Sequence, residues 1–346
     1  MKNTTPLLPL FHKFIKHTET GKRLKKNGTR INADSIQNYK SVRINLERFI
    51  EKEQFDWRIS DVAKLNKREF ASEKNYWKKF YNAFTAYLYK KGCHDNYVGT
   101  NVKILRTFLN YLKHEKDFST GDFHKQFHVL KEDIEVLVIS PDQLKFLIHD
   151  ANFDIELPEH LKKIKAIFVF GCTTGLRFSD IFLLSNKNFE KNGADWYLKV
   201  KSKKTKTYTA VKLPDYAIEI YKKYRSNSNR VLLFKPISLI NFNKHLKTIG
   251  KFAGFDAPLV LIREQRGKAS KSISAKPIPF YQKMSSHMMR RTAITTLLIL
   301  GMPEHLVRKI SGHSQTSNSF ARYVHYAQSY MDQEIDKVHK LLSTYD

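Results

Sequence analysis

Six residues in the second half of the chain are of types that together could break a phosphodiester bond. They stand in the segments TGLRFSD, KKTKT, HMMR, SGHS and RYVHY, and are Arg177, Lys204, His287, Arg290, His313 and Tyr323. Arginine guanidinium groups bind the non-bridging oxygens of a phosphate and stabilise the charge that develops during cleavage. Lysine and histidine can transfer protons, and a tyrosine hydroxyl can act as a nucleophile. The set predicts a site in which a tyrosine attacks phosphorus.

Each of these motifs has a simpler explanation when it is taken alone. An arginine at the start of a helix, such as Arg177, commonly forms a surface salt bridge. His287 and Arg290 are three residues apart and share one face of a helix, but this spacing often occurs by chance. His313 fits an ordinary surface turn, and Tyr323 is one of 17 tyrosines. The prediction therefore depends on the ordered combination and not on any single member.

The composition indicates a folded protein with a polyanionic partner. The chain has 346 residues, 41% of them hydrophobic, and its 61 Lys and Arg against 33 Asp and Glu give a net charge of +28. The excess of positive charge is present in both halves, so both are expected to contact phosphate groups. DNA or RNA is the natural partner, although charge alone favours simple solubility or a ribosomal or chromatin role over any enzyme.

The two cysteines and the apolar segments exclude several other classes. Cys93 and Cys172 are far apart and lack the spacing of a zinc site or a disulfide framework, so neither is expected. No apolar run approaches the roughly 18 residues that are needed to span a bilayer. We expect a soluble, cytoplasmic protein that is associated with the nucleoid through its nucleic-acid partner.

Apolar periodicity predicts a first domain made only of helices. Helical stripes run at about 34–52, 67–90 and 96–113, which together define a domain over 30–117. Residues 1–29 are too short for a further module and are expected to form a leader or arm. The polar segment 118–134 lacks a clear period and is expected to be a linker.

The second domain is expected over 135–346. Ser140, Pro141 and Gln143 form a capping sequence for a helix, and another helix is expected over about 158–172. The segment 195–213 alternates around a lysine-rich middle and predicts a β-hairpin with lysines near its tip. Helices account for most of the remainder. The stretch 258–283 is basic and rich in serine, which predicts a long mobile insertion. The sequence does not indicate its role. The fold class is therefore mainly α with a small β-hairpin or sheet.

In its residues and their order, the chain resembles the tyrosine recombinase, or phage integrase, family. The resemblance covers nearly the whole chain and implies a SAM-like core-binding domain followed by a catalytic domain with the DNA breaking-rejoining fold. It implies that Arg177 and Arg290 clamp the scissile phosphate. His287 and His313 would be the histidines of the pocket, and Tyr323 would be the nucleophile that forms a 3′-phosphotyrosyl link.

The resemblance leaves two residue assignments open. Lys204 resembles the hairpin lysine that protonates the leaving 5′ oxygen, and Lys206 is a close alternative. The spacing from the histidine to the tyrosine is one residue longer than in many members of the family. Tyr326 and Tyr330 therefore remain alternatives to Tyr323.

The resemblance also implies what the protein does and what it binds. It implies a site-specific recombinase of double-stranded DNA that integrates or excises a mobile element or inverts a segment, without a cofactor. Four protomers would assemble on two duplexes and exchange a C-terminal helix, residues 328–342, with accessory DNA-bending proteins as further partners. Two alternatives remain: a type IB topoisomerase that relaxes DNA, and an inactive DNA-binding protein on the same fold.

Overall fold

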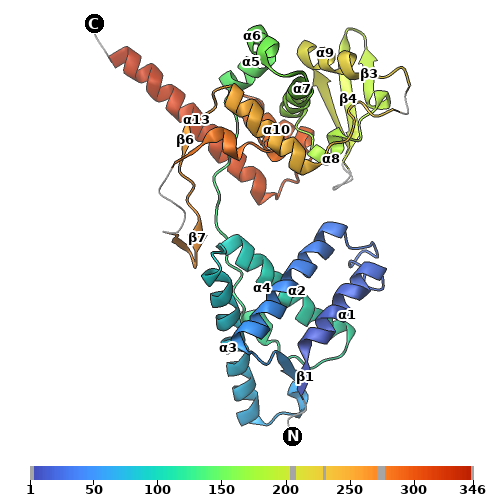
Figure 1. Ribbon diagram of the computed structural model, residues 1–346, viewed down its shortest axis with the longest axis vertical. Helices are drawn as coiled ribbons and strands as arrows, with labels where there is room; N and C mark the ends of the chain where they lie inside the picture. Colours follow the sequence, from blue (N-terminus) through green and yellow to red (C-terminus); the bar gives the residue numbers. More distant parts are fainter. Residues whose placement is uncertain (1–3, 203–207, 229–230, 271–276, 344–346) are drawn as a thin grey trace. The chain divides into compact units, whose positions relative to one another are not determined.

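The computed structural model describes residues 4–202, 208–228, 231–270 and 277–343 (Figure 1). The chain forms two compact units. The N-terminal unit comprises residues 1–134 together with 261–275, and the C-terminal unit comprises 135–260 together with 276–346. Within the described residues, no helix has both the length and the apolar character needed to cross a membrane.

Residues 4–134 of the N-terminal unit form a bundle of helices with one small antiparallel sheet. Its elements are β1 (Thr4–Pro6), α1 (Leu7–Thr20), α2 (Ala33–Glu53), β2 (Arg58–Ser60), α3 (Lys67–Lys90) and α4 (Asp95–Glu115), with short 3₁₀ turns at Val62–Lys64 and Phe123–Gln126. Strand β1 pairs with β2. The three helices predicted from apolar periodicity are confirmed as α2, α3 and α4.

The expected leader over 1–29 is wrong, because much of it is helix α1. Leu7, Phe11 and Phe14 of this helix are fully buried in the same core as α2, α3 and α4. The Phe11 ring lies 4.9 Å from the ring of Phe108 on α4, in an edge-to-face arrangement. Burial of such aromatic side chains is strongly stabilising, so α1 is part of the folded unit.

The expected linker over 118–134 is also folded into this unit. Phe123 and Phe127 are buried in its hydrophobic core, and the Phe127 ring lies 6.1 Å from that of Trp77 on α3. Glu132 is 5% exposed. The boundary between the two units lies between Ile134 and Glu135.

The described part of 258–283 has regular structure, which differs from the expected mobile insertion. It contains the short strands β6 (Pro258–Leu259), β7 (Glu264–Gln265), β8 (Lys268–Ala269) and β9 (Ile278–Pro279). Strand β6 pairs with β9 in the C-terminal unit, whereas β7 and β8 form a hairpin that belongs to the N-terminal unit.

The C-terminal unit combines helices with one three-stranded antiparallel sheet. Its elements are α5 (Pro141–His149), α6 (Ala151–Glu156), α7 (Glu159–Thr174), α8 (Phe178–Ile181), β3 (Phe189–Asn192), β4 (Asp195–Lys201), β5 (Tyr208–Leu213), α9 (Asp215–Tyr224), α10 (Leu239–Phe252), α11 (Ser286–Ile299), α12 (Glu304–Ser311) and α13 (Asn318–Ser343), with 3₁₀ turns at Asn186–Asn188 and Phe280–Lys283. The predicted hairpin is confirmed as β4 and β5, in the sheet order β3-β4-β5. Its tip, 203–207, lies outside the described residues.

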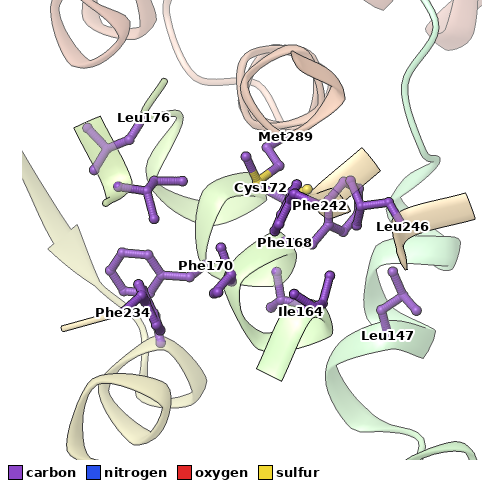
Figure 2. Close-up of a cluster of buried hydrophobic side chains, with 14 of the residues drawn as sticks. Leu147, Ile164, Phe168, Phe170, Cys172, Leu176, Phe234, Phe242, Leu246 and Met289 are labelled. Atoms are coloured by element: carbon purple, nitrogen blue, oxygen red, sulfur yellow. The ribbon is translucent and has the colours of Figure 1, made fainter. Parts of the chain in front are cut away.

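Helix α7 runs through the core of the C-terminal unit. Phe168 and Phe170 on α7 are fully buried, in one cluster with Phe242 on α10 and Met289 on α11 (Figure 2). Gly171 lets α7 approach α11 closely, because a Cβ atom at this position would lie 2.5 Å from the Sδ atom of Met289. The end of α7 and the first turns of α11 are thereby held together.

Candidate active site

Arg177 is positioned by the sharp end of helix α7. Gly175 follows the helix in the left-handed region, with φ of 65°, and its N–H donates to the carbonyl of Gly171. A glycine adopts this conformation at little cost, as the TTGLR sequence predicts. Arg177 then stands at the N-terminal cap position of α8. Its Nη1 atom donates to the Oγ atom of Ser202 at 3.0 Å.

Ser202 is a site residue that the sequence analysis missed. It follows strand β4, is 6% exposed, and donates through Oγ to the Oδ2 atom of Asp180 at 3.3 Å. Asp180 is itself buried on α8. The hydroxyl therefore links the Arg177 guanidinium to a buried carboxylate. The neighbouring lysines proposed for proton transfer, Lys204 and Lys206, lie in 203–207, outside the described residues.

Arg290 connects three segments of the site. Its side chain, on the first turns of α11, is 6% exposed. Nη1 donates to the carbonyl of Gly175 at 2.9 Å, Nη2 donates to the carbonyl of Ser311, and Nη2 lies 3.4 Å from Nδ1 of His313. The ends of α7 and α12 are therefore joined through one guanidinium. His287 lies one turn earlier on α11 and is exposed.

His313 lies just after α12, and its surroundings define its tautomer. Its Nδ1 atom faces Nη2 of Arg290, and the Oγ atom of Ser311 lies 2.8 Å away. A guanidinium has donors only and the Ser311 hydroxyl can also donate, so with Nδ1 as the acceptor in both contacts the proton of the neutral ring is assigned to Nε2. His313 can then donate a hydrogen bond from Nε2 to an anion.

The site carries positive charge that lacks full compensation. Burial, followed by the positive charge of Arg177, lowers the pKa of Arg290 to about 10, while Tyr323 and Asp180 act in the opposite direction. Burial, followed by the charges of Arg290, Arg177 and Arg308, lowers the pKa of His313 to about 4. A bound anion would relieve both effects, because it favours the charged form of each group. The electrostatics suit a phosphate.

Tyr323 lies on α13 beside His313. Its ring centroid is 5.9 Å from that of His313 and 6.0 Å from that of Phe320. Tyr323 is only 7% exposed and packs in a cluster with Val136 and Ile294. The ring is thus held firmly, and its phenol interacts electrostatically with Arg290.

The two alternative tyrosines have environments that disfavour the phenolate. Burial, then the charge of Glu135 and the neighbouring Tyr330, raises the pKa of Tyr326. Burial, then the charges of Glu334 and Asp142, raises the pKa of Tyr330. A nucleophilic tyrosine needs nearby positive charge instead.

The geometry gathers Arg177, Arg290, His313 and Tyr323 around one position, and it adds Ser202 as a buried support. These side chains come from the α7–α8 junction, the end of β4 and three consecutive helices of the C-terminal third. Within the described ranges, no three His, Cys, Asp or Glu side chains gather in a way that could hold a metal ion. The arrangement can bind a phosphodiester and present a phenol to it.

Comparison with known proteins agrees with this chemistry. Residues 138–329, more than half of the chain, match the model of the phage integrase family. No curated protein sequence matches the chain. The chain belongs to the phage integrase family, and it is a site-specific tyrosine recombinase, an enzyme that cleaves and rejoins DNA.

Several solved structures share the fold at low identity. The XerH site-specific recombinase, bound to a palindromic difH substrate after cleavage, is 14% identical with a TM-score of 0.61, over 95% of each chain. The Tn1549 transposon integrase in complex with transposon right end DNA is 14% identical with a TM-score of 0.59, over 97% of this chain and all of that one. A lambda integrase tetramer bound to a Holliday junction is 13% identical with a TM-score of 0.60, over 93% of this chain and 78% of that one.

Proposed function

We propose that Tyr323 attacks the scissile phosphate of a specific DNA site and forms a 3′-phosphotyrosyl intermediate. The phenol oxygen bonds to phosphorus as the bond from phosphorus to the 5′ oxygen breaks. A 5′ hydroxyl of a second strand then reverses the step and releases the tyrosine. The phosphodiester bond energy is conserved in the protein link. The event would integrate or excise a mobile element, or invert a segment.

We assign each side chain one role in this reaction. Arg177 and Arg290 bind the two non-bridging oxygens and stabilise the charge of the transition state. Neutral His313 donates from Nε2 to the same phosphate, which leaves His287 to accept the phenol proton. Lys204, or its neighbour Lys206, protonates the departing 5′ oxygen.

The observation that carries the proposal is the contact of Arg290 with both the end of α7 and His313. Through it, two arginines and a neutral imidazole converge beside one tyrosine. Tyr326 and Tyr330 lie further along α13, where burial and then nearby carboxylates raise their pKa values. Of the three tyrosines, Tyr323 alone lies against the histidine of the pocket.

The proposed assembly is a homotetramer on two double-stranded DNA sites. Exchange of two duplexes needs four cleavages, and a lambda integrase tetramer of the same fold has been seen on a Holliday junction. The distal part of α13, residues 328–342, is the segment that neighbouring protomers would exchange. Accessory DNA-bending proteins would assist synapsis, and the enzyme would act in the cytoplasm at the nucleoid.

The experiment that tests this function is recovery and sequencing of DNA covalently attached to the protein in cells. We expect adducts at one or a few sites with the unmodified protein and none with Tyr323→Phe. The exchange removes only the hydroxyl, so the ring contacts with His313 and Phe320 persist and the melting temperature should stay within about 2 °C. Tyr326→Phe is the matched control and should retain the adducts.

The distribution of adducts separates the alternatives. Scattered adducts that disappear in Tyr323→Phe would indicate a relaxing enzyme of the type IB topoisomerase kind. Adducts that persist in Tyr323→Phe and vanish in Tyr326→Phe would identify Tyr326 as the nucleophile. Absence of adducts from every variant would favour a DNA-binding protein without catalysis.

A further inference from the structure

The β7–β8 hairpin comes from the second half of the sequence, as its orange colour in Figure 1 shows. By its contacts, however, it belongs to the N-terminal unit. Its two central residues, Arg266 and Gly267, have φ of 57° and 71°, as expected for a tight two-residue turn. Their N–H groups donate to the two carboxylate oxygens of Asp95, each at 2.7 Å. The tip of the hairpin is thus held at the start of α4.

A second contact holds the strand that leads into the hairpin. The guanidinium of Arg263 donates to both carboxylate oxygens of Glu132, with Nε at 3.0 Å and Nη2 at 2.6 Å. The backbone N–H of Glu264 also donates to Glu132, at 2.8 Å. Bidentate arginine–carboxylate pairs of this kind are among the strongest hydrogen-bonded contacts in proteins.

Both acceptor carboxylates are buried when the hairpin is docked. Asp95 is 0% exposed and Glu132 is 5% exposed. A buried carboxylate that loses its donors is strongly destabilising. We refer to residues 261–269 as the strap.

Two segments of the chain that pass from one unit to the other lie close in sequence to the strap and to its anchor at Glu132. Glu132, which holds the strap, is four residues before Val136, and Val136 is buried in the C-terminal unit. On the second crossing, Arg263 is four residues after Leu259, which pairs with Ile278 in that unit. Four residues of chain span at most about 14 Å, so each crossing is short.

We propose that the strap is an intramolecular tether that keeps the two units together for the DNA reaction, with Asp95 and Glu132 as positioning residues. Docking makes Glu132 and Arg263 a single anchor in the N-terminal unit, from which two short segments enter the C-terminal unit. Two short chain segments, and not one, then join this anchor to the C-terminal unit. The effect on DNA rests on the proposed function, whereas the tether itself does not.

The tether also has a direct connection to the candidate nucleophile. Val136, at the end of the first crossing, packs in one cluster with Phe320 and Tyr323 on α13. A fixed Glu132 therefore limits the movement of the chain that supports Tyr323. With the strap released, the Glu132 carboxylate would lose its strap donors, and the segment would be held by the two hydrogen bonds between the Glu132 backbone and the Asn96 side chain and by buried residues such as Phe127.

The tether is tested by the distance distribution between spin labels on the two units, measured by pulsed electron paramagnetic resonance in the DNA-free protein. Labels are attached at Glu53→Cys and Glu219→Cys, both exposed positions, in a Cys93→Ser background. Replacing residues 263–268 by alternating glycine and serine should at least double the width of the distribution. Glu132→Gln should broaden it in the same direction. The matched control is Asp133→Asn, which is adjacent and exposed and should leave the width unchanged.

An unchanged width in the strap replacement, with both units still folded by circular dichroism, would overturn the tether. The replacement alters no residue of 1–134, so it remains informative if Glu132→Gln fails to fold. With DNA, we expect apparent affinity to fall about tenfold because the second unit loses effective concentration. If the distance distribution broadens while the DNA affinity and the cleavage rate on saturating DNA stay unchanged, the positioning role of Asp95 and Glu132 is overturned. Failure of the parent protein to form adducts would count against the proposed function and leave the distance result intact.

Discussion

Replacement of Ser202 by alanine tests whether the buried hydroxyl positions the Arg177 guanidinium. The change removes the acceptor of the 3.0 Å hydrogen bond from Nη1 and the donor that reaches Asp180 at 3.3 Å. Hydrogen bonds to charged groups contribute about 1.5–3 kcal/mol. Because Arg177 is only partly buried, we take the lower end of this range. A loss of about 1.4 kcal/mol from the transition state corresponds to a tenfold slower cleavage step.

The assay is single-turnover formation of the covalent adduct on a DNA substrate whose cleaved product cannot religate. Saturating DNA separates the cleavage step from binding. We expect Ser202→Ala to cleave about tenfold more slowly and to bind DNA within about twofold of the parent protein. The free energy of unfolding should fall by about 1 kcal/mol, because one hydrogen-bonded group is lost near a buried carboxylate.

Ser202→Thr is the control, since it retains the hydroxyl and adds only a methyl group. It should cleave faster than Ser202→Ala, even if the added volume lowers the melting temperature slightly. Equal cleavage rates for the parent protein and Ser202→Ala would refute the reasoning. The same conclusion would follow if both variants were slowed in proportion to their loss of stability.

Two further predictions concern stability. Burial lowers the pKa of His124 to about 4, so between about pH 6.5 and 4 the unfolded chain binds a proton that the folded chain does not. The free energy of unfolding should therefore fall as pH falls through this window, by up to about 3 kcal/mol for this residue. Between pH 7.5 and 5, the melting temperature of His124→Gln should fall less than that of the parent protein. An equal fall would contradict the assignment of this pH dependence to His124. Gly171→Ala should lower the melting temperature, because overpacking against Met289, about 1–3 kcal/mol, outweighs a helix-propensity gain of about 1 kcal/mol. An unchanged or higher melting temperature would show that Met289 moves aside without cost.

Local signals in the sequence were sufficient for much of the fold. The capping box of Ser140 and Gln143 is present at the start of α5, and the glycine turn before Arg177 is present after α7. Helix α1 was missed because its signals are weak locally: Pro6 provides no side-chain cap, and no acidic residue stands in the first turn. Its stability comes from distant partners such as Phe108, which a local pattern does not reveal.

The candidate site could be predicted for those residues whose type alone indicates their chemistry. Arg290, His313 and Tyr323 could be selected because guanidinium, imidazole and phenol groups act on phosphate. Ser202 could not be selected, because a serine acquires its role only when the end of β4 meets Arg177. The burial of Tyr323 also depends on remote residues, including Val136.

The N-terminal unit is built from two stretches of chain that are far apart in the sequence, and this affects how it folds during synthesis. When residue 134 has been made, the segment that covers Asp95 and Glu132 does not yet exist. About 130 more residues must be translated before Arg263 and Gly267 can bind these carboxylates, which takes roughly 7–26 s at 5–20 residues per second. We therefore expect the N-terminal unit to reach its final stability late, after most of the C-terminal unit has left the ribosome.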